Sequence, residues 1–147
     1  MSLQERIETD LISAMKQKDE VKLNVLRALK SAAKNSQIQK QKELEEADFI
    51  QLIQSQIKSR RDSVELYEKG GRPELAQKEM AEINILTEYL PEQMSADEVR
   101  VIVKKAIQES GAQGQQEMGK VMALVMPQLR GKADGSLISQ IVKEELQ

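Results

Sequence analysis

The sequence predicts an all-α fold with two helical domains, namely an N-terminal four-helix domain that contains a long antiparallel hairpin and a C-terminal three-helix domain. Three observations predict it. The 147 residues favour strong helix formers and include only three prolines and seven glycines. Apolar residues recur every three or four positions along most of the chain. Pro91 interrupts this pattern, so we assign domains to residues 1–90 and 95–147, with 91–94 as a linker.

The first two helices are predicted from their apolar faces. The first face consists of Leu3, Ile7, Leu11, Ala14 and Met15. Asp19 can cap the second helix, whose apolar stripe consists of Val21, Val25, Leu26, Leu29, Ala32 and Ala33. Residues 34–45 are polar and rich in lysine and glutamate, so they form either an exposed helical extension or a mobile connection.

The next two helices are predicted to form the hairpin. A third helix runs from about Ala47 to Lys69, and Gly70-Gly71 ends it. Pro73 opens a fourth helix because the first helical position needs no amide hydrogen. Pro91 closes that helix because the residue before a proline is disfavoured in α geometry. Two long helices joined by a tight glycine turn predict an antiparallel pair.

Capping signals define the last three helices. The capping box Ser95-Ala96-Asp97-Glu98 starts a helix at residue 96, and Gly111 suits its C-terminal cap. A sixth helix follows, and Pro127 is expected to kink or end it near Met126. Asp134 can cap a seventh helix. The apolar faces of these two helices are Met118, Val121, Met122, Val125 and Leu129, then Leu137, Ile138, Ile141, Val142 and Leu146.

The composition excludes several classes of function. Cysteine and histidine are both absent, which removes thiolate nucleophiles, imidazole bases and the usual transition-metal ligands, so we predict no metal site and no cofactor. No pair among the 24 carboxylates stands out as an acid–base couple, and we predict no catalytic residue. The net charge is 22 − 24 = −2, so any grip on nucleic acid must be local. No apolar run approaches the ~20 residues of a membrane span, and the N-terminus lacks the apolar segment of a signal peptide, which predicts a cytoplasmic protein without membrane contact.

One glycine-containing segment has nearly the residue spacing of a nucleotide-binding loop. Gly114 to Val121 has the spacing G-x-x-x-x-G-K, but Val121 stands where a magnesium-binding Ser or Thr belongs. No predicted strand precedes the segment. We therefore interpret it as the start of the sixth helix.

A second glycine turn, Arg130-Gly131-Lys132, is a candidate phosphate site. It leads into the free amides of a helix N-terminus, which can hold a phosphate between the two cations. The alternative is structural, with Gly131 and Asp134 capping adjacent helices and the cations solvated. Phosphate contacts of this kind position a nucleic acid without reading its sequence. The candidate nucleic-acid-binding residues are Lys120, Arg130, Gly131, Lys132 and Lys143.

Arg60 falls near the centre of the apolar stripe of the third helix, where a cation needs a partner. Glu79 lies inside the apolar stripe of the fourth helix, and Glu82 lies at its edge. One interpretation is therefore a structural ion pair between Arg60 and Glu79 or Glu82 across the hairpin. The other is a phosphate-binding pair formed by Arg60 and Arg61.

Two long motifs, in this order, resemble the GatB/YqeY family and its YqeY-like members. The first is RRDSVELYEKGGRPELA at 60–76, followed by Glu79, Glu82 and Tyr89-Leu90-Pro91. The second is MGKVM at 118–122, followed by RGKADG at 130–135. The resemblance covers nearly the whole chain and implies a small, two-domain, all-helical protein of bacterial type.

The resemblance also implies a function. The family includes the tail of the GatB subunit of the tRNA-dependent amidotransferase, which helps to hold tRNA while the chemistry takes place in other domains and subunits. That tail often has Asn-Pro where this chain has Asp134-Gly135, which weakens the transfer of tRNA contacts to this turn.

We therefore expect a non-catalytic accessory module that binds tRNA or a tRNA–enzyme assembly through the C-terminal domain. Its associated reaction is carbon–nitrogen ligation with glutamine as amide donor. The alternatives are a helical protein-interaction adaptor without an RNA role, and an enzyme with such ligase activity of its own. The missing His and Cys count against the enzyme, although a Ser–Lys nucleophile is compatible with the composition.

Overall fold

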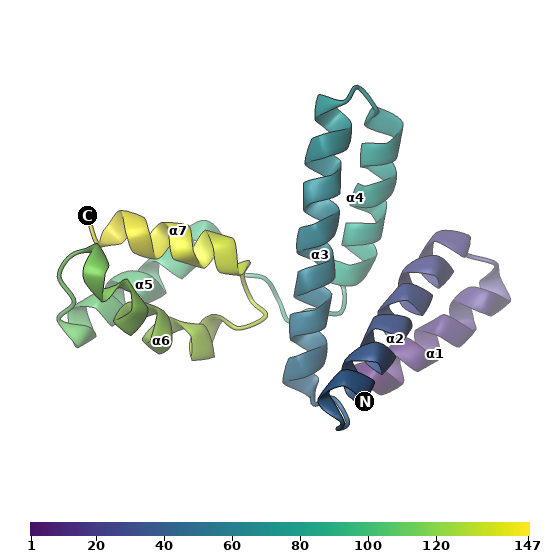
Figure 1. The fold of residues 1–147 in the computed structure, drawn as a ribbon, viewed down its shortest axis with the longest axis horizontal. Helices are drawn as coiled ribbons and strands as arrows, with labels where there is room; N and C mark the ends of the chain where they lie inside the picture. Colours follow the sequence, from purple (N-terminus) through teal and green to yellow (C-terminus); the bar gives the residue numbers. More distant parts are fainter. The chain divides into compact units, whose positions relative to one another are not determined.

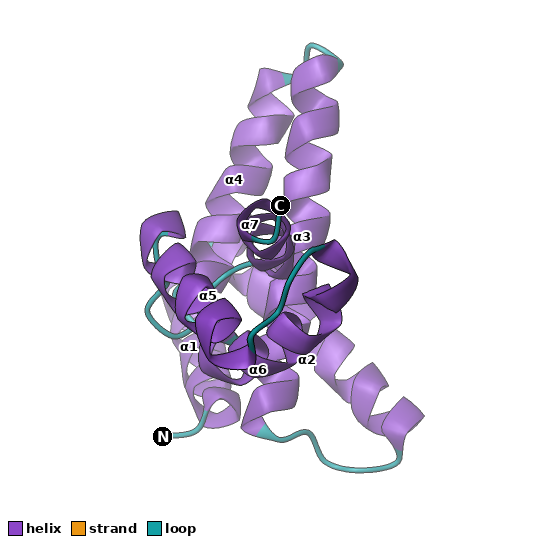
Figure 2. Ribbon diagram, turned by 90° about the vertical axis from the view of Figure 1, so that its left-hand side faces the viewer, coloured by secondary structure: helices purple, strands orange, loops and turns teal.

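The computed structural model describes all residues, 1–147, and consists of seven α-helices and one short 3-10 helix (Figure 1). It contains no strand (Figure 2), which confirms the predicted all-α class. The chain divides into two compact units, Met1–Leu90 and Pro91–Gln147. Each unit has its own apolar core.

The first unit begins with the antiparallel helices α1 (Leu3–Gln17) and α2 (Glu20–Lys40). The Asp19 side chain accepts a hydrogen bond from the amide of Lys22 and so caps α2. Lys18, at φ +57°, makes the turn between the helices. Both alternatives for residues 34–45 apply in part, because α2 continues to Lys40 and only residues 41–45 form the connection to the next helix.

Helices α3 (Glu46–Lys69) and α4 (Pro73–Thr87) pack along each other as an antiparallel hairpin (Figure 1). Pro73 is the first residue of α4, as its missing amide hydrogen predicts. α4 ends at Thr87, three residues earlier than Leu90, and the amides of Tyr89 and Leu90 donate to carbonyls three residues back. The helix therefore ends in a tightened turn before Pro91.

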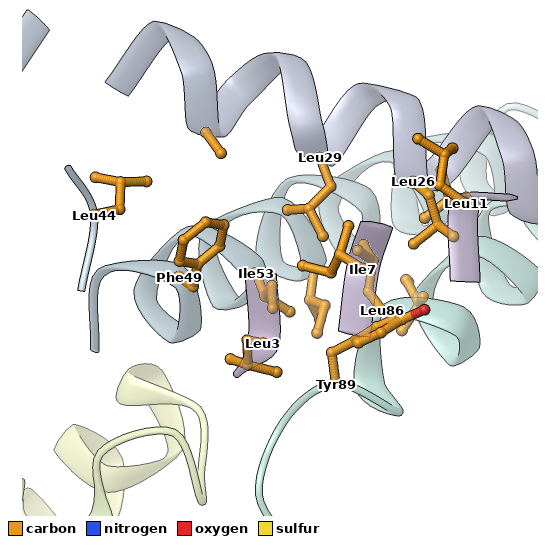
Figure 3. Packing of buried hydrophobic residues seen from close by; sticks show 14 residues of the cluster. Leu3, Ile7, Leu11, Leu26, Leu29, Leu44, Phe49, Ile53, Leu86 and Tyr89 are labelled. Carbon is orange, nitrogen blue, oxygen red and sulfur yellow. The ribbon is translucent and has the colours of Figure 1, made fainter. Parts of the chain in front are cut away.

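The core of the first unit lies where α1 and α2 cover the lower part of the hairpin (Figure 1), and Figure 3 shows its side chains. Leu26 and Leu29 from α2, Ile53 from α3 and Leu86 from α4 have no exposed surface. The Gly70-Gly71 end of the hairpin projects beyond α1 and α2 (Figure 1).

The second unit contains α5 (Ala96–Ser110), the 3-10 helix η1 (Gln115–Glu117), α6 (Met118–Leu129) and α7 (Gly135–Glu145). Ser95 and Glu98 form the predicted capping box of α5, and Gly111 at φ +69° caps its end. Residues 114–121 form η1 and the start of α6, and no strand precedes them. The core consists of buried residues from all three α-helices, among them Val99, Val103, Val121, Val125, Leu129, Ile138 and Val142.

The alternative in which α6 ends near Met126 is wrong, because the helix continues through Pro127 to Leu129. Pro127 lies in the last turn, so its ring removes one amide donor close to the end of the helix. That donor would have bonded to the carbonyl of Ala123, an exposed residue that water reaches. The side-chain amide of Gln128 donates to the carbonyl of Leu124 at 3.2 Å and supports the same turn.

Candidate functional site

The four candidate phosphate-binding cations lie on the antiparallel pair α6 and α7 and on the loop between them. Lys120 is in the first turn of α6, and Lys143 is in the last turn of α7. Arg130 and Lys132 are in the connecting loop, at the other end of the pair. Lys120 and Arg130 are ten positions apart in the sequence, which corresponds to about 15 Å along a helix. The structure thus places the cations as two pairs at opposite ends of α6 and α7.

All four of these side chains are exposed, and none forms an ion pair with a carboxylate. Arg100, on α5, provides the contrast. Its guanidinium donates to Glu145 at 2.7 Å and to Glu144 at 2.9 Å. Hydrogen bonds to these carboxylates raise the pKa of Arg100, and the bond from Arg100 lowers the pKa of Glu144. Arg100 is therefore occupied, whereas the four candidate cations remain available.

The backbone of the 130–133 loop is hydrogen-bonded to residues of the segment that precedes α5. The carbonyl of Gly131 accepts a hydrogen bond from the Gln93 side chain at 2.7 Å, and the carbonyl of Lys132 accepts one from the amide of Met94 at 2.8 Å. Gly131 itself is buried and has φ +79°, a conformation that favours glycine. Nothing in the sequence pattern linked residues 93–94 to this loop.

At the start of α7 the structure agrees with the structural alternative for this turn, in which Asp134 caps the helix. The Asp134 side chain accepts a hydrogen bond from the amide of Ser136 at 2.9 Å. This carboxylate brings negative charge to the helix N-terminus, where a bound phosphate would need positive potential. The turn therefore offers a nucleic acid the Arg130 and Lys132 side chains rather than the amides of α7.

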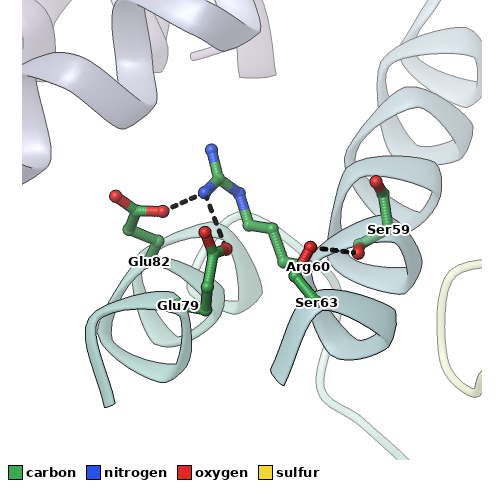
Figure 4. Close-up of polar contacts among 5 residues, drawn as sticks. All are labelled: Ser59, Arg60, Ser63, Glu79 and Glu82. Atoms are coloured by element: carbon green, nitrogen blue, oxygen red, sulfur yellow. Dashed lines mark hydrogen bonds and ion pairs between the residues drawn. The ribbon is translucent and has the colours of Figure 1, made fainter. Parts of the chain in front are cut away.

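In the hairpin, the Arg60 guanidinium contacts two carboxylates of α4 (Figure 4). Its Nη1 donates to Glu79 at 3.2 Å and also to Glu82. Glu82 is the one buried charged residue of the chain, with 8% of its surface exposed. The guanidinium is thus engaged across the hairpin, as the structural interpretation of Arg60 describes.

Sequence reasoning missed a second polar cluster, at the end of α4. The hydroxyl of Tyr89 donates to the Asp10 carboxylate at 2.5 Å, and the Arg6 guanidinium lies 4.6 Å from the centre of the tyrosine ring. Arg6 also donates to the carbonyl of Glu88 at 3.0 Å. Burial, followed by the bond to Asp10, raises the pKa of Tyr89. The cluster joins α1 to the C-terminal end of α4.

No three acidic side chains lie together as a possible metal site. None of the helices combines the length and the apolar character that crossing a membrane requires.

Comparison with known proteins gives consistent matches. The family described as Yqey-like protein matches residues 4–146. The protein named altered inheritance of mitochondria protein 41, mitochondrial, of Pyrenophora tritici-repentis is 31% identical over 142 residues, which cover 95% of this chain and 78% of the relative. The protein of the same name from Lachancea thermotolerans is 34% identical over 99 residues (67% and 53%), and that from Kluyveromyces lactis is 31% identical over 129 residues (82% and 70%).

These comparisons correct one prediction and confirm another. All three are named as mitochondrial, which contradicts the predicted cytoplasmic location. The inference failed because the lack of an apolar leader argues only against secretion, whereas mitochondrial targeting segments are amphipathic and rich in arginine. The relatives are fungal, so they do not support a bacterial type. The match over residues 4–146 shows that this chain belongs to the YqeY-like protein family, as its two motifs predicted.

Proposed function

We propose that this protein is a non-catalytic accessory module that binds tRNA, or a tRNA–enzyme assembly, through its C-terminal domain. In this proposal residues 1–90 and 95–147 act as separate domains joined by 91–94. The observation that carries the proposal is the set of four exposed cations without carboxylate partners, Lys120, Arg130, Lys132 and Lys143. An unpaired cation binds a phosphate without first breaking an ion pair.

The spacing of these cations favours contact with a nucleic-acid backbone. The two pairs, about 15 Å apart by helix rise, meet phosphates at two separate points. The three aromatic residues of the chain, Phe49, Tyr67 and Tyr89, all lie in the first unit, so the second unit has no platform for stacking bases. Residues 91–147 carry seven Lys or Arg and eight Asp or Glu, and 7 − 8 = −1 gives little general attraction for RNA. Binding therefore depends on the local cations.

The association with an amidotransferase rests on the family resemblance. The names of the fungal relatives refer to mitochondria and their inheritance, and they name neither a ligand nor a reaction. The absence of His and Cys favours an accessory role over catalysis. The proposal is thus tested first as tRNA binding and only then as an effect on a partner enzyme.

The experiment measures tRNA binding to the full chain by fluorescence anisotropy across a salt series. Three or four phosphate contacts give a slope of log affinity against log salt of roughly −2 to −3. Arg130→Ala/Lys132→Ala and Lys120→Ala/Lys143→Ala should each reduce that slope by somewhat less than two units. The matched control is Lys58→Ala/Lys78→Ala, which removes the same charge from exposed positions of the first unit.

The outcome separates the two leading hypotheses. A tRNA preference that survives competitor RNA and is lost in the double variants of the second unit supports the proposal. Absence of binding at low salt, or an equal effect of the control variant, contradicts it and favours a protein-interaction adaptor.

A further inference from the structure

A pocket of about 230 Å³ opens between α1 and α2 in the first unit. Its apolar lining includes Ile7, Ala33 and Phe49, all of them largely buried. Its polar lining includes Glu8 from α1 and Lys30 and Lys34 from α2. The pocket therefore combines an apolar interior with two lysines and one carboxylate.

Exposed apolar side chains continue this surface along α1. Gln4 and Glu8 line the pocket, and Ile12 and Met15 follow them on the same helix face at four- and three-residue steps. Ile12 is 48% exposed and Met15 is 47% exposed. From Gln4 to Met15 the surface spans about 16 Å, or three helical turns.

A row of cations on α2 lies beside these α1 residues. The Lys30 Nζ atom is 2.9 Å from a Glu8 carboxylate oxygen, and the Arg27 Nη2 atom is 4.0 Å from the Met15 sulfur. These two contacts show that the faces adjoin. Arg27, Lys30 and Lys34 are spaced by three and four residues and so share one face of α2.

We call this surface the α1–α2 groove and define it by the pocket together with Ile12, Met15, Arg27, Lys30 and Lys34. It carries three cations, and Glu8 is the only carboxylate that lines the pocket. The local charge is thus 3 − 1 = +2, although residues 1–90 carry 15 − 16 = −1. Arg27 and Lys34 have no carboxylate partner. A positive strip beside an apolar row complements an acidic, amphipathic partner.

We propose that the α1–α2 groove binds an acidic amphipathic helix of a partner protein. The pocket takes one apolar anchor residue of that helix, and its next apolar residues lie against Ile12 and Met15. Acidic residues two turns apart on its flank pair with Arg27 and Lys34, the two cations of the groove that have no carboxylate partner. The apolar row favours a helix over a nucleic-acid backbone, which offers phosphates but no apolar stripe. The proposal concerns the first unit and is independent of tRNA binding by the second.

The test uses two fluorescein-labelled synthetic helices that share one leucine stripe, flanked by glutamates in one peptide and by lysines in the other. Binding to the full chain is followed by anisotropy. The acidic peptide should bind at least tenfold more tightly than the basic peptide. Lys34→Glu and Ile12→Ser should each weaken the acidic peptide about fivefold or more, whereas Lys58→Glu, at an exposed position of α3, should change its affinity less than twofold.

Several results would overturn the proposal. These are equal binding of the two peptides, no binding of the acidic one, or no effect of Lys34→Glu. Self-association that Ile12→Ser abolishes would make a second copy the occupant. A loss of tRNA affinity in Lys34→Glu would show that the groove binds a nucleic acid instead of a helix. Ile12 and Lys34 are both exposed, so both variants should fold, and circular dichroism spectra of each variant test this.

Discussion

Replacing Arg60 by methionine removes the cation that pairs with Glu82 and leaves most of the apolar stem of the side chain in place. Glu82 has 8% of its surface exposed, and no other cation contacts it. The carboxylate would then lie between α3 and α4 without compensation. We expect the first unit to lose stability.

The burial of the three side chains sets the size of this loss. Breaking a deeply buried pair costs about 3–5 kcal/mol. The Arg60 and Glu79 side chains are 21% and 20% exposed, so water partly solvates the cluster and we expect about 2–3 kcal/mol. In a unit of this size that corresponds to a fall of at least about 8 °C in Tm. Glu82→Gln should cost less, about 1 kcal/mol, because Arg60 keeps its bond to Glu79.

Urea unfolding followed by tyrosine fluorescence measures the effect. The chain has no tryptophan, and both of its tyrosines lie in the first unit, so the signal reports that unit alone. Lys69→Met in the same hairpin is the matched control. Its ion pair with Glu65 joins side chains that are 72% and 65% exposed, so its loss should have little effect. The reasoning is refuted if Arg60→Met destabilises the unit no more than Lys69→Met.

Three further predictions concern substitutions at single residues. Tyr89→Phe removes the hydrogen bond to Asp10 and should lower the free energy of unfolding of the first unit by about 1–2 kcal/mol in the same urea assay, in which Tyr67 is then the remaining fluorophore. The pKa of Tyr89 is raised in the folded state. The stabilisation of the first unit by the Tyr89 hydroxyl is therefore complete below the ordinary pKa of 10.0, and it decreases as the pH rises above that value. Thermal unfolding between about pH 8 and 11 should therefore show that the Tm of the wild type falls more steeply with rising pH than the Tm of Tyr89→Phe. Gly131→Ala should cost the second unit about 1 kcal/mol because φ is +79°, whereas Gly119→Ala, in a helix and facing open space, should stabilise it by about 0.5–1 kcal/mol, both measured by circular dichroism.

The sequence by itself determined the helices, because their start and stop signals act over one turn of backbone. Asp19 and Asp134 cap the helices that follow them, and Gly111 ends the helix before it. A side chain and the amide it caps lie two or three residues apart, so their meeting needs no information about the rest of the fold. The hairpin could be predicted in the same way, since a tight two-glycine turn between two long helices with apolar stripes favours antiparallel packing. The family motifs are equally readable without coordinates.

Helix ends without a strong cap were harder to predict. The tolerance of α6 for Pro127 depends on how close the proline lies to the end of the helix. The division of residues 34–45 between helix and connection also needed the structure, because their polar composition suits both states.

Only the tertiary structure decided which distant groups meet. Tyr89 and Asp10 are 79 residues apart, and Gln93 and Gly131 are 38 apart, so local conformational preferences do not specify either contact. The separation of the four candidate cations into two pairs follows from the antiparallel packing of α6 and α7. Likewise, Lys34 lacks a carboxylate partner while Arg60 has two, although both are cations on helices. The charged residues can be identified from the sequence. Which of them are paired, buried or free depends on the directions in which packed helices point their side chains.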